Sequence, residues 1–360
     1  MKLGIVGLPN VGKSTLFNAL TGEDVPALNF PFSTTDSNIA VARVPDERLK
    51  VLTEMYNADR TVYTTIEFYD MAALVKGASE GSGLGNKFLA QIRESAAIVH
   101  VVRCFEDENV VHVDGDINPA RDIETVNLEL IFADIEMLER RIEKTRKALK
   151  GDKGLEKELA LLDSINGRLF EGTPVRLMEL EEDERAFLGT LDLLTTKPVI
   201  YVANVSDKDG GENPYISAVR EAAEAEGADV CIVAAKLEAE LTGLDEADRQ
   251  EFQKELGIEE SGLEKLIKAS YHMLDLLSFL TAGKPEVHAW TIKRGTRAPQ
   301  AAGKIHSDIE RGFIRAETIT YENLIECGGL PQAKEKGLVR SEGKEYVVKD
   351  GDVIHFLFNV

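Results

Sequence analysis

The feature that most constrains this sequence is a glycine-rich loop placed directly after a short apolar run at its start. Residues 3–6 predict a buried strand, residues 7–15 read G-L-P-N-V-G-K-S-T, and residues 16–20 begin a helical pattern. The spacing G-x-x-x-x-G-K-S, between a strand and a helix, is that of a phosphate-binding loop. Its backbone N–H groups close around phosphate oxygens at a helix N-terminus. The sequence therefore predicts an α/β domain that binds a nucleotide.

Two side chains of this loop carry chemistry that its backbone cannot supply. Lys13 is expected to place its positive charge on the β- and γ-phosphates and to act as a catalytic residue. The hydroxyl of Ser14 is expected to bind Mg²⁺, the cofactor of such a site. The predicted nucleotide-binding residues of the loop are Asn10, Val11, Gly12, Lys13, Ser14 and Thr15.

A magnesium site of this kind also needs a carboxylate on a neighbouring strand. Asp70 closes the run 66–70 and is predicted to fill this role, directly or through water. A switch threonine between the loop and Asp70 should add a further metal ligand. Thr34, in the polar segment 33–35, is the predicted ligand, and Thr35 is the alternative.

Short apolar runs rich in β-branched residues alternate with helical patterns through the first 280 residues. Runs that are apolar throughout are typical of strands buried on both faces of a parallel sheet. Their alternation with helices predicts an α/β fold, a doubly wound parallel sheet of the P-loop NTPase type. The predicted strands are Leu3–Val6, Thr65–Tyr69, Ala97–Val102, Val199–Val202 and Val230–Ala234.

Between the third and fourth predicted strands, the apolar residues change to steps of three and four. From Leu128 they fall at positions 131, 135, 138 and 142, which is the seam of a coiled coil. The segment 151–154 breaks the pattern, and leucines at 155, 162 and 169 resume it at heptad spacing. We predict an antiparallel helical hairpin, inserted over residues 122–185. Two ordinary surface helices packed on the sheet are the alternative.

The last part of the sequence has a different character. After an expected helix around Leu263–Leu280, the segment 281–285 predicts a linker between a domain over 1–280 and another over 281–360. In the second domain, residues 287–292, 346–348 and 353–358 predict strands, with an Asp-Gly turn at 350–351. Residues 301–311 predict a helix between them. The sequence thus predicts a small C-terminal α+β domain.

The charge of the chain limits which partners it can bind. Its 42 basic and 63 acidic residues give a formal charge of −21, which repels the phosphates of DNA. No apolar run approaches the 18 or so residues of a membrane span, and three scattered cysteines predict reduced thiols in a cytoplasmic protein. Between residues 284 and 315, however, seven basic residues stand against three acidic ones. With Trp290 and Phe313, this basic segment predicts contact with RNA, and a solvated face around a small core is the alternative.

Several motifs together resemble one protein family. Besides the loop at 7–15, they are N-F-P-F-S-T at 29–34, L-V-K-G-A-S at 74–79, G-L-G-N-K-F at 83–88 and V-V-R-C-F at 101–105. The stretch from 298–306 to 351–353 is similar to a TGS domain. Over essentially its whole length, the chain resembles the Obg-like ATPases known as the YchF family. The resemblance implies a P-loop ATPase or GTPase with a coiled-coil insertion and a C-terminal, ubiquitin-like TGS domain.

The same resemblance implies partners and residue roles. It implies action at the ribosome, at its large subunit, and in stress responses. Residue by residue, it implies that Lys13 and Ser14 bind phosphate and Mg²⁺ and that Thr34 is the switch-loop ligand of the metal. It also places the family's proposed catalytic histidine at His112. Neutral imidazole can hold an attacking water, and a loop histidine without a role is the alternative.

The sequence departs from switch GTPases at two positions close to Asp70. Ala73 stands where the D-x-x-G motif has glycine, and Leu74 stands where Ras-like enzymes carry a water-orienting glutamine. An apolar side chain cannot orient a water. Hydrolysis is therefore expected to use another group or to be slow, and a nucleotide-gated binding module with incidental hydrolysis is an alternative function.

Base selection is expected at N-V-S-D, residues 204–207, after the apolar run 199–203. GTPases have N-K-x-D at this place, and the missing lysine weakens guanine binding. The family usually carries glutamate at the last position, whereas this chain has the aspartate that reads guanine. The resemblance to the family implies ATP as the substrate, and GTP is the alternative. The predicted base-contacting residues are Asn204, Val205, Asp207 and Ala235.

Overall fold

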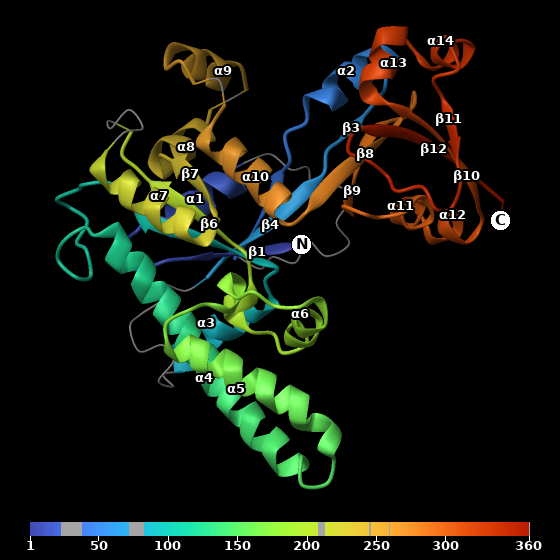
Figure 1. The fold of residues 1–360 in the computed structure, drawn as a ribbon. Coiled ribbons are helices and arrows are strands. Elements are labelled where there is room, and N and C mark those ends of the chain that lie inside the picture. The colour runs from blue at the N-terminus through green and yellow to red at the C-terminus, as the bar shows by residue number, and fades with distance from the viewer. Residues whose placement is uncertain (23–37, 72–82, 208–212, 245, 259, 360) are drawn as a thin grey trace. The chain divides into compact units, whose positions relative to one another are not determined.

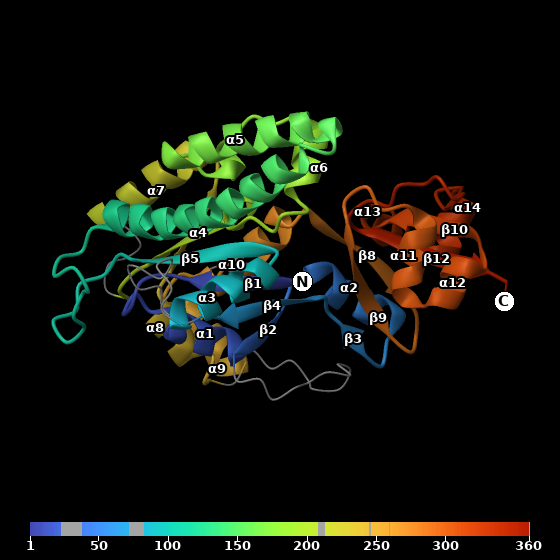
Figure 2. The same ribbon diagram turned by 90° about the horizontal axis from the view of Figure 1, so that it is seen from below.

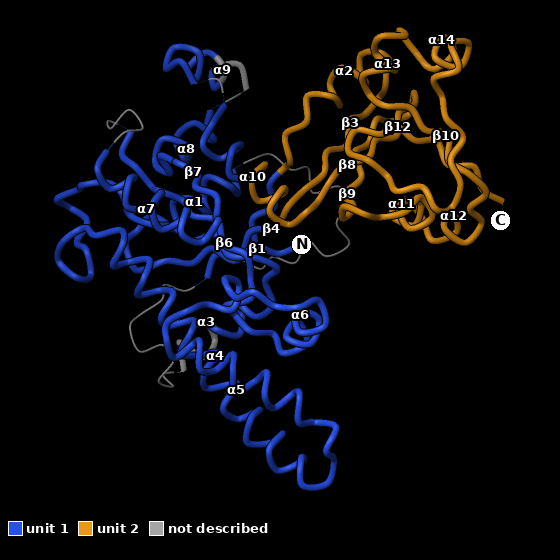
Figure 3. Tube along the Cα trace, viewed as in Figure 1, with its two compact units in different colours: residues 1–42, 67–266 blue, residues 43–66, 267–360 orange. Residues whose placement is uncertain are grey.

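The computed structural model describes residues 1–22, 38–71, 83–207, 213–244, 246–258 and 260–359. The chain forms two compact units, each with its own core (Figure 3). Unit 1 contains Met1–Ala42 and Glu67–Leu266, and unit 2 contains Arg43–Ile66 and Ile267–Val360. Each unit is built on its own six-stranded sheet (Figure 1). Among the described helices, none is both long enough and apolar enough to cross a membrane.

The sheet of unit 1 has the order β2-β4-β1-β5-β6-β7. Strands β4, β1, β5, β6 and β7 pair in parallel, so their carboxyl ends meet at one edge. Every residue of β5 and β6 is buried, which agrees with their largely apolar sequences. The predicted parallel sheet is confirmed. Its strands are β1 (Lys2–Val6), β2 (Ile39–Arg43), β4 (Thr65–Asp70), β5 (Ala97–Arg103), β6 (Val199–Asn204) and β7 (Asp229–Val233).

Helices cover both faces of this sheet, so it is doubly wound as predicted (Figure 2). Helices α4 (Pro119–Ala148) and α7 (Pro214–Glu226) pack together on one face, while α1 (Lys13–Thr21) and α8 (Ala235–Leu241) pack together on the other. Outside the helical insertion, this part also has α3 (Gly83–Glu94), α9 (Glu246–Glu255) and α10 (Gly262–Met273). α10 begins in unit 1 and ends in unit 2.

The predicted helical hairpin is confirmed and projects from the sheet (Figure 1). α4 runs for 30 residues, and α5 (Glu156–Phe170) returns along it after the short η3 (Lys153–Leu155). Ile131, Ile135, Leu138 and Ile142 face a buried set from α5, which explains the steps of three and four. The chain then returns through η4 (Val175–Leu177), α6 (Glu182–Leu188) and η5 (Leu194–Thr196).

Unit 2 has a mixed sheet in the order β11-β10-β12-β8-β9-β3. β8–β9, β10–β12 and β10–β11 are antiparallel, whereas β8–β12 and β3–β9 are parallel. The strands are β3 (Thr61–Val62), β8 (Leu276–Ala282), β9 (Val287–Lys293), β10 (Phe313–Thr320), β11 (Arg340–Glu342) and β12 (Asp352–Phe358). The helices are α2 (Glu47–Tyr56), α11 (Ala298–Ile305), α12 (Ser307–Arg311), α13 (Tyr321–Cys327) and α14 (Leu330–Glu335).

Two predictions at the start of this part were wrong. The helix expected to reach Leu280 ends at Met273, and Asp275, with φ +53°, turns the chain into strand β8. The first five residues of β8 are buried, and such a run has the same apolar pattern as a buried helix. The expected linker 281–285 is instead the end of β8 and a hairpin turn, in which Gly283 N donates to the Glu286 carbonyl oxygen at 3.1 Å.

Two further predictions in the C-terminal part need correction. Residues 346–348 form no strand; Val347 makes a single antiparallel bridge to Arg297. The expected helix 301–311 is divided into α11 and α12, because His306 has extended backbone angles and caps α12 with its side chain. The sequence pattern also did not indicate β10, which pairs along its length with β12.

A segment far from the C-terminus completes unit 2. Residues 43–66 carry α2 and β3, and β3 pairs with β9 through Thr61↔Val287 and Val62↔His288. Leu49 and Leu52 of α2 are fully buried in a core whose other buried residues come from the C-terminal part. The boundaries of the compact units therefore differ from those of the predicted domains 1–280 and 281–360. The division into these two domains stays a prediction about which parts of the chain act as functional domains.

Candidate nucleotide site

The glycine-rich loop leaves the N-terminus of α1 open to an anion. Gly12, with φ +97°, precedes Lys13, and no side chain of a described residue caps this end of the helix. The first N–H groups of an uncapped helix attract negative charge. A Cβ on Gly12 would lie 2.1 Å from Asn204 Nδ2, and a Cβ on Gly7 would lie 2.5 Å from the Val101 carbonyl oxygen. Both positions therefore require glycine.

Lys13 is a buried cation in the first turn of α1. Lys13 is 7% exposed, and its Nζ donates to the Leu8 carbonyl oxygen at 2.8 Å. Burial lowers the pKa of the Lys13 ammonium to about 8, while the charge of Asp70 acts in the opposite direction. A desolvated cation is stabilised by a nearby anion. Lys13 thus favours a phosphate group at the open end of α1.

Asp70 ends strand β4, next to β1 in the sheet. Its Oδ1 atom is buried and has no hydrogen-bond partner among the described residues. Burial raises the pKa of the Asp70 carboxyl, and the charge of Lys13 lowers it. An orphaned carboxylate oxygen beside a phosphate-binding loop fits a hard cation such as Mg²⁺. Ser14, exposed in the first turn of α1, supplies a hydroxyl of the type that such a cation binds, and Thr15 beside it is half-buried.

The predicted switch residues lie outside the described part of the chain. These are Thr34, with its alternative Thr35, and the two positions near Asp70, Ala73 and Leu74. Asn10 of the loop can be placed, because it is exposed with φ +62° and its Nδ2 donates to the Val111 carbonyl oxygen at 3.0 Å.

Asn204 joins three loops at the carboxyl edge of the sheet. It ends β6 and is 4% exposed. Its Nδ2 donates to the Val11 carbonyl oxygen at 2.8 Å, and its Oδ1 accepts from Ala235 N at 3.1 Å. The structure therefore brings together Val11, Asn204 and Ala235, which the sequence had singled out from separate segments. Both ends of the Asn204 amide are engaged by the protein's own backbone.

The other two predicted base contacts differ in exposure. Val205 is 7% exposed, and its N donates to the Val233 carbonyl oxygen at 3.0 Å. Asp207 is exposed, and its Oδ1 accepts from Ser206 Oγ at 3.2 Å. A carboxylate in this position can accept hydrogen bonds from a base, whereas the Val205 side chain can offer it apolar contact.

His112 is the predicted residue whose surroundings differ most from the expected role. It is 5% exposed, its Nε2 lies 2.8 Å from Asp122 Oδ2, and its Nδ1 accepts from Asp114 N at 3.1 Å. Because a backbone N–H can only donate, Nδ1 holds the lone pair and Nε2 carries the proton that is donated to Asp122. Both ring nitrogens are thus engaged within the protein, and in this arrangement neither can hold a water.

Two residues that the sequence pattern did not assign to the site hold His112 and the segment before it. Arg103, 2% exposed at the end of β5, donates from Nη1 to the Val110 carbonyl oxygen at 2.9 Å and from Nε to that of Phe105 at 3.1 Å. Burial lowers the pKa of its guanidinium. Asp122 is the other residue. The signal for Arg103 was an arginine at the end of a largely apolar strand, since a buried cation needs partners.

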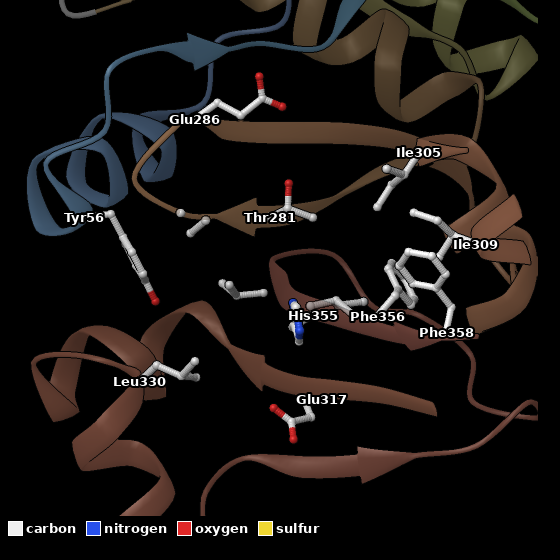
Figure 4. A pocket seen from close by; sticks show the side chains of 14 residues that line it. Tyr56, Thr281, Glu286, Ile305, Ile309, Glu317, Leu330, His355, Phe356 and Phe358 are labelled. Carbon is white, nitrogen blue, oxygen red and sulfur yellow. The ribbon is translucent and has the colours of Figure 1, made fainter. Parts of the chain in front are cut away.

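Unit 2 also contains a cavity, of about 320 Å³ (Figure 4). Apolar side chains line much of it, and Glu286 and Glu317 contribute carboxylates. Those carboxylates form ion pairs with Arg60 and Lys334. A cavity with two acidic side chains does not attract a polyanion, so the nucleotide site remains at the glycine-rich loop.

An open helix N-terminus, a buried lysine and an orphaned carboxylate meet where neighbouring parallel strands end. This combination defines a P-loop NTPase of the switch type. A family model described as 50S ribosome-binding GTPase matches residues 2–137, and the model of the YchF GTPase C-terminal family, described as a protein of unknown function, matches residues 276–359.

Comparison with known proteins identifies the family within this class. The chain is 53% identical to a Bacillus subtilis protein named Ribosome-binding ATPase YchF, over 99% of each chain. It is 52% identical to the protein of the same name from Escherichia coli O157:H7, over 100% of this chain and 99% of the other. A solved structure of the Schizosaccharomyces pombe YchF GTPase matches with a TM-score of 0.90 and 36% identity, over 99% of this chain and 97% of that one. The chain belongs to the YchF family, and the resemblance of its motifs is confirmed.

Proposed function

We propose that this protein is a ribosome-associated nucleotide hydrolase that converts ATP to ADP and phosphate. The observation that carries this proposal is the buried Lys13 ammonium beside the orphaned Asp70 carboxylate, at the open end of α1. Two relatives that are more than half identical to this chain carry the name Ribosome-binding ATPase YchF, which supports both the reaction and the partner.

The loop residues bind and orient the triphosphate. The backbone around Asn10–Gly12 and the first turn of α1 surround the phosphates, and Lys13 offsets the negative charge that develops on the γ-phosphate and the leaving oxygen. Ser14 and Asp70 would hold Mg²⁺, with Thr34 as a further ligand. Bound there, the ion would neutralise charge on the β- and γ-phosphates. His112 would hold the attacking water, which requires it to leave Asp122 and Asp114.

The choice of base rests with few residues. Since both ends of the Asn204 amide bind the protein backbone, base contacts fall to Val205, Asp207 and the backbone near Ala235. The names of the bacterial relatives favour ATP, whereas the aspartate at 207 and the name GTPase carried by the yeast protein favour GTP. We propose ATP as the substrate and GTP as the alternative. Calorimetric titration with ADP and GDP tests this choice, and tighter binding of GDP would overturn it.

Phosphate release from ATP and GTP, compared with the Lys13→Ala variant, tests the proposed reaction. Turnover well above that of the variant is expected. The second candidate function is a nucleotide-gated binding module, and the engaged ring of His112 favours it. Turnover no greater than that of the variant, together with tight ADP binding by the unmodified protein, would establish the second function and remove the first.

The basic segment of unit 2 is the proposed contact with ribosomal RNA, and the large subunit is the proposed side. All seven cations of the segment are exposed. Arg294, Arg297 and Arg311 form ion pairs with acidic residues. Lys284, Lys293, Lys304 and Arg315 are the cations proposed to contact RNA.

The two aromatic residues of this segment contribute less than predicted. Phe313 is 7% exposed in the core, and Trp290 stacks on His288 with ring centroids 3.7 Å apart. We therefore propose that this segment contacts the phosphates of ribosomal RNA through its charges and does not stack on the bases. We further propose that 281–360 acts as a TGS domain, that 122–185 acts as an insertion, and that the protein is cytoplasmic.

A further inference from the structure

A buried hydrogen bond joins the first turn of α4 to the segment that contacts the phosphate-binding loop. His112 Nε2 donates to Asp122 Oδ2 at 2.8 Å, and the two side chains are 2% and 3% exposed. The residue before His112 is Val111, whose carbonyl oxygen accepts from Asn10 Nδ2 at 3.0 Å. Consecutive contacts thus connect Asp122 on α4, the segment around His112 and the nucleotide loop.

The bond to Asp122 determines what His112 can do. While Nε2 donates to Asp122 and Nδ1 accepts from Asp114 N, the ring has no nitrogen left for a water. The burial of the ring also keeps bulk water away from it. His112 in this position can neither hold nor orient an attacking water.

We propose that Asp122 is a positioning residue that holds His112 in a withdrawn position and so restrains ATP hydrolysis. Hydrolysis proceeds when His112 leaves Asp122 and turns toward the nucleotide. This inference rests on the proposed role of His112 in hydrolysis, and it adds the residue that controls when that role is exercised.

The rest of the segment is fixed independently, so the histidine can leave without unfolding its surroundings. Arg103 holds the segment before His112 through the carbonyl oxygens of Phe105 and Val110. On the other side, Arg121 donates to Asp116 Oδ1 at 2.8 Å and, at a longer 3.4 Å, to Asp122 Oδ1, which is not the oxygen that binds His112. Neither set of contacts involves the His112 ring. Loss of the bond to Asp122 therefore frees mainly the ring and its own residue.

The position of Asp122 connects this restraint to the helical hairpin. α4 has 30 residues and is therefore about 45 Å long. Asp122 lies in its first turn, and the hairpin core of Ile135, Leu138 and Ile142 lies toward its other end. A partner that displaces the hairpin would move Asp122 relative to His112. Partner binding and hydrolysis would then be coupled through one hydrogen bond.

The test compares kcat for phosphate release at saturating ATP in five variants and the unmodified protein. Asp122→Ala removes the acceptor, and kcat is expected to rise about five- to tenfold, as loss of one buried hydrogen bond shifts the withdrawn population. Asp122→Asn keeps an acceptor oxygen and should stay within about twofold of the unmodified protein. His112→Ala should lower kcat, and Asp122→Ala combined with His112→Ala should have the same low value as His112→Ala alone.

Asp134→Ala is the matched control on the same helix. Asp134 is also buried, but it accepts from Leu194 N and Thr195 rather than from His112. If the rise reflects the release of His112 and not a weakened α4, this variant shows no rise in kcat. A similar rise in Asp134→Ala would overturn the proposal, and thermal melting of each variant shows which ones are folded.

The remaining outcomes separate this inference from the function on which it rests. If His112→Ala lowers kcat while Asp122→Ala leaves it unchanged or lowers it, the restraint is overturned and the proposed role of His112 stands. If His112→Ala has no effect in either background, the role of His112 in hydrolysis is itself overturned. A rise in kcat that persists in the double variant also overturns the restraint, because the rise would not depend on His112.

Discussion

The two units of this protein share a plan, a six-stranded sheet covered by helices, but differ in where their polar chemistry lies. In unit 1, buried polar side chains gather at the carboxyl ends of the strands, with Lys13, Arg103 and Asn204 all less than 8% exposed. In unit 2, the cations of the basic segment are exposed, and the described cavity is lined mainly by apolar side chains. A buried polar group interacts strongly with a few partners that are shielded from water. Exposed charges interact weakly one by one, and their effect on binding comes from all of them together.

The contrast between the units sets the size of the mutational effects expected in each. A buried group in unit 1 leaves unsatisfied partners when it is removed, so one substitution has a large effect. An exposed charge in unit 2 is screened by solvent and salt, so one substitution has a small effect. Equal effects in the two units would contradict this contrast.

The largest effect is expected from Lys13→Ala. ATP turnover should fall by about 100- to 1000-fold, because the charge that stabilises the transferring phosphoryl group is lost. The free energy of unfolding without nucleotide should not fall in the matched variant Lys13→Met. The lost hydrogen bond to the Leu8 carbonyl oxygen is offset by removal of a buried charge, whose pKa burial lowers to about 8. Phosphate release and urea denaturation measure the two quantities. A clear loss of stability in Lys13→Met would contradict this account.

Asn204→Ala should have the next largest effect. It leaves the Val11 carbonyl oxygen and Ala235 N without their partner, at a cost of about 2–4 kcal/mol in the free energy of unfolding. ADP affinity should fall as well, because the phosphate-binding loop loses its brace. Urea denaturation and calorimetry with ADP check both effects. Asn18→Ala, at an exposed position on α1, is the control and should change stability by less than about 0.5 kcal/mol.

A third prediction concerns the acid sensitivity of unit 1. Burial lowers the pKa of His100 to about 3, with the charges of Arg176 and Lys13 acting in the same direction. An unfolded histidine titrates near 6.5, so between about pH 6.5 and 3 the unfolded state binds more protons and stability falls as pH falls. The slope reaches about 1.4 kcal/mol per pH unit.

His100→Phe removes this titration and keeps an aromatic ring against Tyr201. Urea denaturation of the variant at several pH values from about 7 to 4.5 should show a flatter pH dependence than that of the unmodified protein. His272→Gln, at an exposed histidine, is the control and should leave the slope unchanged. An equal slope in His100→Phe would exclude His100 as a source of acid sensitivity.

The difference between the units also explains what could be predicted from the sequence. In unit 1, motif residues lie on the loops that follow buried strands, and local pattern placed β1, β5 and β6 with the residues at their ends. The helical hairpin could also be predicted, because its apolar residues recur at steps of three and four within a single helix. The roles of Asp122 and Arg103 could not be predicted, because they depend on hydrogen bonds that only the folded structure shows. The withdrawn position of His112 could not be predicted for the same reason.

In unit 2, the pattern was ambiguous or the paired segments were distant. β8 was predicted as helix because a run buried on both faces shows no alternation. β3 could not be assigned to this sheet, since its partner Val287 lies 226 residues from Thr61 along the chain. Phe313 was considered for RNA contact, but it completes the core of the sheet. Such pairings depend on the whole fold rather than on local sequence.

The smallest effect for each substituted residue is expected in the basic segment of unit 2. Single changes of Lys284, Lys293, Lys304 or Arg315 to alanine should weaken ribosome binding by about two- to threefold at low salt. Combined, they should reduce the slope of log affinity against log salt by about one for each phosphate that is no longer bound. Sedimentation with ribosomes across a salt series measures this slope. Lys336→Ala, outside the segment, is the control. If one of the four single variants abolished binding while the others had no effect, unit 2 would bind through one specific contact and not through the sum of its charges. That result would contradict the contrast with unit 1.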